Sequence, residues 1–187
     1  MNKWLILILM AGLAMLVVTA CATSRGSYGT APYRVTRSDG SFEIRDYAEL
    51  KLASTAKGED NRSFMQLFRY IEGANVTKEK ISMTTPVFMN KDGMSFVLPE
   101  KNKDNAPQPS SQGVTLKTVP ARSMAVYRYS GSASRSNEQA ALKELMTWLS
   151  TNKLDFVNEP VVAYYDPPWT PPFFRRNEVM VPLKPVK

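Results

Sequence analysis

The chain has 187 residues, enough for one domain of ordinary size and a short accessory segment. Its formal net charge is +7, but the 24 lysines and arginines are scattered and form no basic helix or stripe, which argues against nucleic-acid binding. The sequence has no histidine, the commonest general base and a frequent ligand of metals and haem iron. Ser-His and Cys-His catalysis are therefore excluded. A non-catalytic protein is favoured, although lysine, tyrosine or aspartate chemistry stays open.

The first twenty residues have the pattern of a secretory signal. Lys3 supplies a positive start, and the apolar run over residues 4–18 is followed by small residues. This run of roughly 15 residues is shorter than the ~20 that a membrane-spanning helix needs. Residues 1–20 are therefore predicted to be a signal peptide rather than an uncleaved anchor.

Cys21 is the single cysteine of the chain and cannot form an internal disulfide. Residues 18–21, Val-Thr-Ala-Cys, resemble a bacterial lipobox, in which the cysteine is lipidated and becomes the mature N-terminus. Several acyl chains, at ~0.8 kcal/mol per buried CH₂, anchor a protein permanently. By analogy with such lipoproteins, Ala22 in place of aspartate favours the outer membrane, facing the periplasm. Residues 21–32 then form a flexible tether, and residues 33–187 the folded domain.

The first half of this domain carries strand, helix and strand patterns in turn. Residues 33–47 alternate apolar and polar side chains around Ser-Asp-Gly-Ser at 38–41, which predicts a β-hairpin. A helix is predicted over 61–72, capped by Asp60 or Asn61 and ended by Gly73. Its apolar residues follow helical spacing at Phe64, Leu67, Phe68 and Ile71. Further strands are expected from Leu50 and over 81–89 and 94–98.

The second half repeats this order of signals. Ser136 and Gln139 form a capping box for a helix over 137–151, which Asn152 closes. Strands are expected over 114–118, 124–129, 161–165 and 179–183. A strand-helix-strand-strand unit written twice predicts an α+β fold, a distorted β-barrel or curled antiparallel sheet with two helices.

Residues 165–179 combine prolines with aromatic side chains. Four prolines between 167 and 172 exclude a helix or a central strand, because proline fixes φ and lacks an N–H. A disordered linker would not carry Trp169, Phe173 and Phe174 together. We expect a rigid loop that covers an apolar surface. Alternatively, these aromatics simply pack, and Arg175, Arg176 and Glu178 only stiffen the loop through salt bridges.

Together with Lys-Ile-Ser-Met-Thr-Thr-Pro-Val at 80–87 and Met-Ser-Phe-Val-Leu-Pro at 94–99, this loop resembles the SOUL family of haem-binding proteins. The resemblance runs from about residue 33 to 183. It implies a distorted β-barrel with two helices, similar to the effector-binding domains of some drug-responsive regulators. It also implies non-covalent binding of haem or another tetrapyrrole.

The resemblance places the ligand on the first helix. The family pattern gives Phe64 and Phe68 as apolar contacts and Arg69 as the basic partner of the propionates. Met65, one turn before Arg69, is a further contact to the ring or a ligand of the iron. A second basic position of the family falls at Asn61, beside Arg62. Alternatively, Phe64 and Phe68 belong to the core stripe of the helix and pack on the sheet, while the arginines form a solvated face.

Some SOUL proteins are thought to ligate haem iron through histidine, which this chain lacks. The sequence therefore predicts a membrane-anchored, non-catalytic protein that binds haem or another flat hydrophobic ligand without histidine ligation. The main alternative is an interaction or structural lipoprotein of the bacterial cell envelope that has lost haem binding. An enzyme acting on a hydrophobic small molecule is a third hypothesis. The sequence indicates no particular protein partner.

Overall fold

A computed structural model describes residues 28–110 and 112–185 of the chain. The predicted signal peptide over 1–20, Cys21 and most of the tether lie outside the described residues and stay predictions. Within the described part, no helix has the length and apolar character needed to cross a membrane.

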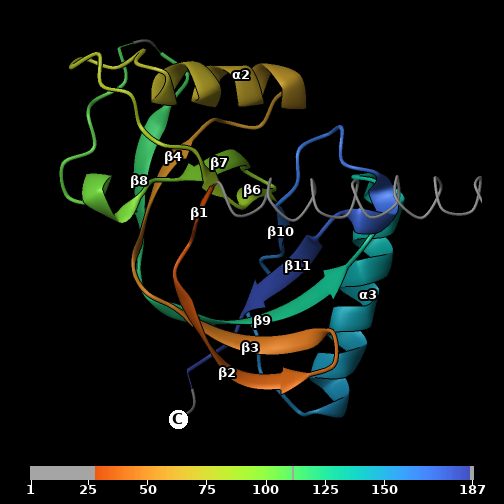
Figure 1. The fold of residues 1–187 in the computed structure, drawn as a ribbon. Coiled ribbons are helices and arrows are strands. Elements are labelled where there is room, and N and C mark those ends of the chain that lie inside the picture. Colours follow the sequence, from red (N-terminus) through yellow and green to blue (C-terminus); the bar gives the residue numbers. More distant parts are fainter. Residues whose placement is uncertain (1–27, 111, 186–187) are drawn as a thin grey trace, which may run out of the picture.

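Nine antiparallel strands form one curled sheet, a half-barrel (Figure 1). In spatial order they are β2 (Tyr33–Asp39), β3 (Phe42–Tyr47), β9 (Arg122–Tyr129), β11 (Asn177–Pro182), β10 (Val161–Tyr164), β6 (Val87–Asn90), β7 (Gly93–Val97), β4 (Leu50–Ser54) and β8 (Thr115–Val119). A separate parallel pair joins β1 (Gly29–Thr30) to β5 (Thr84–Thr85), and Ala31 is buried, so the predicted flexible tether is wrong at its C-terminal end: residues 29–31 belong to the folded domain. The predicted α+β fold with a curled antiparallel sheet is confirmed.

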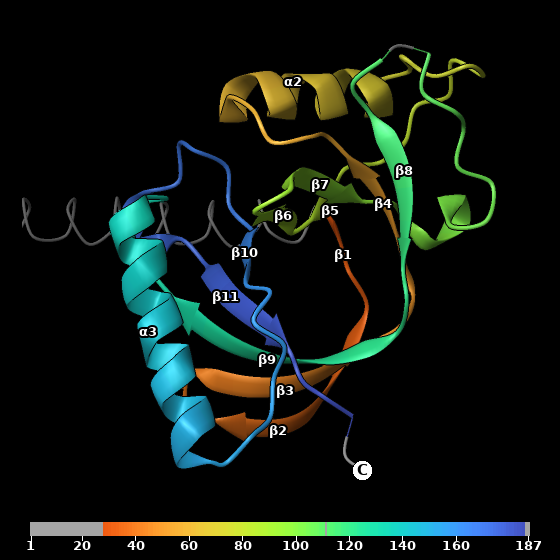
Figure 2. The ribbon, with the colours of Figure 1, turned by 180° about the vertical axis from the view of Figure 1, so that it is seen from behind.

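Two helices cover the outer face of this sheet (Figures 1 and 2). Helix α2 spans Asp60–Ile71 and helix α3 spans Arg135–Thr151, close to the predicted ranges. Beneath α2 lie Ala53, Met94 and Phe96, and beneath α3 lie Ala125, Val179 and Val181. Short 3₁₀ turns occur at η1 (Glu100–Asn102) and η2 (Pro172–Phe174). Because side chains alternate along a strand, the opposite, concave face has its own buried cluster.

The helix starts differ from the prediction, whereas the ends agree with it. Helix α3 is capped by Ser134, whose hydroxyl accepts a hydrogen bond from the Asn137 amide at 3.3 Å, so the Ser136 capping box is wrong. Helix α2 has Glu59 at its N-cap, without a side-chain cap bond, so neither Asp60 nor Asn61 is the cap. Asp60 instead lies in the first turn, where a carboxylate interacts favourably with the helix dipole. Gly73 (φ +109°) and Asn152 do end the helices.

The strand predicted over 81–89 is interrupted. Strand geometry begins only at Thr84, and Pro86 separates β5 from β6 because it has no N–H to donate to a ladder. Ile81 is buried under α2, and its amide donates to the carbonyl of Ile71 at 2.8 Å. This segment therefore closes the end of α2 instead of extending the sheet.

The predicted repeat is present as β4-α2-β6-β7 and β9-α3-β10-β11. The spatial order of its strands is palindromic, β9-β11-β10 followed by β6-β7-β4, and the halves meet where Val162 lies opposite Met89. The strand that precedes each unit crosses to the other half, since β3 pairs with β9 and β8 pairs with β4. Each half of the sheet is therefore completed by a strand from the other half.

A buried ion pair joins β3 to β11 on the concave face. Arg45 and Glu178 are 1% and 0% exposed, and two guanidinium nitrogens of Arg45 donate to the carboxylate at 2.7 and 2.9 Å. The same carboxylate accepts hydrogen bonds from Arg176 Nε at 2.9 Å and from the Tyr165 hydroxyl at 2.9 Å. The guanidinium of Arg45 also lies over the ring of Tyr33, 4.3 Å from its centroid. Hydrogen bonds from protein groups therefore replace those that water would make to the Glu178 carboxylate.

This ion pair makes the stability of the domain depend on pH. Burial alone would raise the pKa of Glu178, but the hydrogen bonds and charges of Arg45 and Arg176 outweigh burial and lower it. The resulting contribution to the free energy of unfolding is complete above the ordinary glutamate pKa of about 4.3. It is lost as the pH falls through the lower, folded-state pKa.

We expect Glu178→Gln to lower the free energy of unfolding by about 3–5 kcal/mol at pH 7, because Arg45 stays buried without its counter-charge. The loss should shrink as the pH falls below about 4, where the unfolded wild type binds a proton at this carboxylate, and should shrink further until the pH passes the lower, folded-state pKa. Urea unfolding between pH 2.5 and 7 measures both effects, with Glu144→Gln on the exposed side of α3 as the matched control. Equal stability of Glu178→Gln and the wild type at pH 7 would contradict this account.

Candidate functional site

Helix α2 keeps three large apolar side chains at the surface. Phe64, Met65 and Phe68 are 37%, 45% and 38% exposed, whereas Leu67 and Ile71 are buried. More than a third of each phenylalanine side chain is therefore open to solvent, while the rest packs on the protein. Contiguous exposed apolar patches are typical of binding sites.

The four predicted contact residues lie on one exposed face of α2. Phe64 precedes Phe68, and Met65 precedes Arg69, by four residues, the spacing that brings helical side chains together. The rings of Phe64 and Phe68 have their centroids 6.1 Å apart and are only 12° from parallel. Arg69 is exposed beside them. We call this face, Phe64, Met65, Phe68 and Arg69, the α2 stripe.

The stripe rests on a firmly held helix. The ring of Phe64 meets that of Phe96 edge-on, with centroids 5.3 Å apart, which fixes the stripe to β7. The Tyr70 hydroxyl donates to the Pro107 carbonyl at 2.8 Å, and burial raises the pKa of Tyr70 to about 12, so it stays a donor. The Asn75 amide donates to the Tyr70 carbonyl at 3.1 Å and holds the end of the helix. A surface held in this way loses little conformational entropy when a ligand binds.

A groove that the sequence did not predict lies between the N-terminal ends of α2 and α3. Its volume is about 720 Å³, within the ~300–1,000 Å³ of typical small-molecule sites. Residues of β6, β7 and β10 form an apolar floor: Met89, Met94 and Val162. Charged side chains from both helix starts surround it: Lys57, Glu59, Asp60, Arg135 and Glu138. Ser63 on the buried side of α2 also lines the groove, whereas none of the four residues of the α2 stripe does.

Glu138, one of the charged residues that line the groove, is held by a tyrosine at the end of β10. The Tyr164 hydroxyl donates to the Glu138 carboxylate at 2.5 Å. Burial, Glu138 and the more distant charges of Tyr129 and Asp60 raise the pKa of Tyr164, which therefore stays protonated. Asp60 at the start of α2 and Val162 of β10 both line the groove, so the start of α2 lies near β10, which leads into the proline-rich loop (Figure 2).

The proline-rich loop is cross-linked by its own arginines. Arg175 donates through Nε to the Thr170 carbonyl at 2.7 Å and through a second nitrogen to the Pro168 carbonyl. Arg176 pairs with Glu178, with nitrogen and oxygen 2.7 Å apart, as the salt-bridge hypothesis required. Trp169 and Phe173, however, are 79% and 70% exposed, so the expectation that these aromatics cover an apolar surface is wrong. The loop presents them to solvent.

The sequence is similar to those of known proteins. Residues 28–182 match the family described as SOUL heme-binding protein. The chain belongs to this family. Heme-binding protein 2 of Mus musculus is 27% identical to it over 169 residues, which cover 80% of this chain and 81% of the mouse protein.

Two solved structures share the fold of this SOUL protein. The C-terminal domain of EcmrR has a TM-score of 0.55 and 16% identity, covering 82% of this chain and 99% of that domain. A hydrolase from Listeria innocua has a TM-score of 0.56 and 11% identity, covering 80% and 94% of the two chains. At such identities the likeness concerns the fold alone.

The α2 stripe fits a flat apolar group with an acidic edge. It offers two aromatic rings and a thioether for the flat surface, and a guanidinium for carboxylates. Residues 28–110 and 112–185 contain no group of three His, Cys, Asp or Glu side chains placed to hold a metal ion. The sequence offers no histidine to a haem iron, so the stripe could supply contact area, the charge of Arg69 and the thioether of Met65.

Substitutions at neighbouring positions of α2 should separate core from surface. Leu67→Ala should lower the free energy of unfolding by about 2–5 kcal/mol, because it leaves a cavity under the helix. Phe68→Ala should cost no more than about 1.5 kcal/mol, because its ring is already partly in water. Urea denaturation of both variants measures this difference. Equal losses would mean that Phe68 belongs to the core.

Proposed function

We propose that this SOUL protein is a membrane-anchored, non-catalytic binder of haem, or of another flat hydrophobic ligand, without histidine ligation. The observation that carries the proposal is the α2 stripe, a rigid apolar surface left exposed beside a cation. Membership of the SOUL heme-binding family supports the ligand class.

Each residue of the stripe has a defined role in this proposal. Phe64 and Phe68 lie against the face of the ligand, and Met65 fills the contact between these rings and the ligand. Arg69 pairs with a ligand carboxylate, such as a haem propionate, and Arg62 on the same side of the helix supplies a second cation. The groove at the start of α2, lined by Glu59, Asp60 and Ser63, gives space to ligand atoms that extend beyond the N-terminal end of the helix.

The absence of a histidine ligand limits the affinity. Burying ~300 Å² of macrocycle at ~25 cal/mol per Å² gives roughly 7 kcal/mol. The loss of translational and rotational freedom opposes this by ~4–15 kcal/mol. We therefore expect micromolar or weaker binding, without the absorption spectrum of histidine-ligated iron.

A haemin titration tests the site. A chain that starts at Ala22 retains every helix, strand and core residue described between residues 28 and 185. Arg69→Ala should weaken haemin binding by ~1–3 kcal/mol without changing the melting temperature, because Arg69 is exposed. Lys143→Ala, an exposed cation on α3, is the matched control and should bind as the wild type does.

Two results would contradict this proposal. No saturable binding of haemin to the folded chain at tens of micromolar would favour an envelope protein that has lost its ligand. Clear binding with an affinity unchanged by Arg69→Ala would place the ligand elsewhere. Absorption spectra and intrinsic fluorescence quenching, recorded in one titration, distinguish the two results.

The anchoring part of the proposal rests on the sequence at Cys21. Cleavage after residue 20 and lipidation of Cys21 would hold the domain on the outer membrane, facing the periplasm. The chain from Cys21 to Tyr28 reaches at most about 25 Å, at ~3.3–3.6 Å per residue. The domain would then work close to the bilayer surface, where haem and other hydrophobic molecules partition.

Cys21→Ser should abolish incorporation of radiolabelled palmitate and processing by the lipoprotein route. Ala22→Asp is the matched control, because it should keep the label but move the protein from the outer-membrane to the inner-membrane fraction. Equal palmitate labelling of Cys21→Ser and the wild type would contradict lipidation at this residue.

A further inference from the structure

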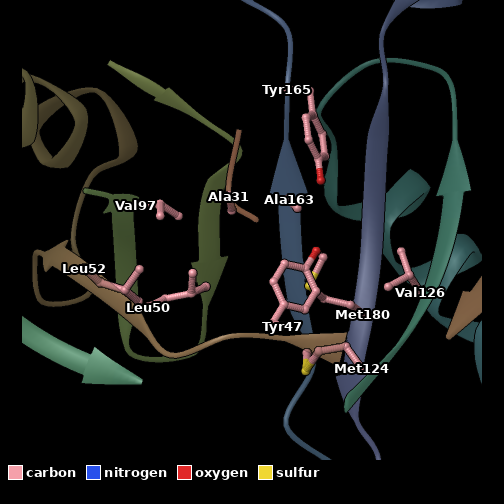
Figure 3. Close-up of a cluster of buried hydrophobic side chains, with 10 residues drawn as sticks. All are labelled: Ala31, Tyr47, Leu50, Leu52, Val97, Met124, Val126, Ala163, Tyr165 and Met180. Carbon is pink, nitrogen blue, oxygen red and sulfur yellow. The ribbon is translucent and has the colours of Figure 1, made fainter. Parts of the chain in front are cut away.

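A second cavity, of about 190 Å³, lies inside the half-barrel on the concave face of the sheet, opposite the helices. Figure 3 shows Leu50 and Leu52 of β4 on one side of this space and Tyr47, Met124 and Met180 on the other. Phe88, Val119 and Val161 complete its apolar wall. The cavity is therefore built from strands of both halves of the sheet.

Two cations share this face with the apolar wall. Lys117 lies opposite Leu52 in the β4–β8 register, and Arg122 lies opposite Tyr47 in the β3–β9 register. Paired residues point to the same face of a sheet, and both cations line the cavity. Their side of the cavity is thus positive.

Arg122 is the less solvated of the two cations. It is half-buried, and none of the described residues accepts a hydrogen bond from its guanidinium. Burial lowers the pKa of Arg122, and only the charge of Glu159 partly offsets this effect. A half-buried guanidinium with free donors is a suitable partner for an incoming carboxylate.

The other polar groups of the cavity have partners or lie at its far side. Ser54 Oγ and Ser95 Oγ are hydrogen-bonded to each other at 2.8 Å. Asn90 Oδ1 accepts the backbone amides of Asp92 and Gly93 at 2.9 and 3.2 Å. The carboxylate of Asp92 also lines the cavity, from the turn between β6 and β7. An anion is therefore favoured at the Lys117 and Arg122 side and disfavoured near Asp92.

The volume limits the size of the ligand. A cavity of about 150 Å³ is known to hold benzene, so 190 Å³ takes a chain of roughly six to eight carbons. A tetrapyrrole is much too large. This site is therefore independent of the α2 stripe and of the function proposed for it.

We propose that the concave cavity binds a small amphipathic carboxylate. Its alkyl chain lies against Leu50, Leu52 and Met180, and its carboxylate pairs with Arg122 and Lys117. A medium-chain fatty acid has this chemistry.

Methionine-methyl NMR of the chain from Ala22 tests the proposal with octanoate as the probe. Met124 and Met180 report on the cavity, and Met65 reports on the α2 stripe. Octanoate should shift the methyl signals of Met124 and Met180 saturably and leave that of Met65 unchanged. Octan-1-ol, with the same chain and no charge, should bind more weakly.

Arg122→Gln should weaken octanoate binding about tenfold and leave octan-1-ol binding unchanged, because only the carboxylate uses the guanidinium. Lys143→Ala is the matched loss of a cation outside the cavity. Leu52→Trp, which fills the cavity, should abolish both ligands. If this variant does not fold, the Arg122→Gln titration decides alone.

Three outcomes would overturn the proposal. The first is that millimolar octanoate causes no saturable shift of the Met124 or Met180 methyl signals. The second is that the Met65 methyl signal shifts as much as those of Met124 and Met180. The third is that Arg122→Gln leaves the affinity for octanoate unchanged. Haemin binding by the same variants separates the two sites, since Arg122→Gln should leave it unaltered and Arg69→Ala should weaken it.

Discussion

The buried carboxylate of Glu178 is the constraint on which the two ends of this fold depend. Glu178 lies on β11 and accepts hydrogen bonds from two guanidinium nitrogens of Arg45 on β3. It also accepts a hydrogen bond from Arg176 at the end of the proline-rich loop. Strand β9 runs between β3 and β11, so the ion pair spans a neighbouring strand and fixes its position as well. An unpaired charge at this depth is costly, and the N-terminal hairpin, the C-terminal strand and the loop must therefore assemble together.

The palindromic sheet explains why this domain has hollows on both faces. Both helices pack on its outer face, and their N-terminal ends converge near the β10–β6 junction, which produces the large groove. None of the helices formed by the described residues covers the concave face, which carries its own apolar cluster and the ion pair. Residues of this apolar cluster line the small cavity. Neither surface belongs to one half of the repeat alone.

The sequence predicted the helices and most strands because these follow from local spacing, but several features have no local signal. Arg45 and Glu178 are 133 positions apart, and nothing near either residue indicates the pairing. Ser134 and Ser136 are equally good caps by composition, so only the position of α3 on the sheet distinguishes them. The spacing that predicted α2 also placed Phe64 and Phe68 beside Leu67 in one stripe. Which of these is buried depends on how the helix is rotated on β7, a tertiary property.

That rotation gives α2 two separate roles. Leu67 and Tyr70 hold the helix to the sheet with the help of Phe64, which packs on Phe96, while Met65, Phe68 and the open part of Phe64 contribute exposed contact area. Residues of the exposed face can therefore change with little loss of stability, so a binding surface can be altered on an intact fold. A ligand that cannot use a histidine must gain its free energy from such area, and a rigid helix supplies it without the entropic cost of ordering a loop. The absence of histidine and the exposure of the stripe are thus both consistent with a ligand that is held by contact area and not by a bond from histidine to iron.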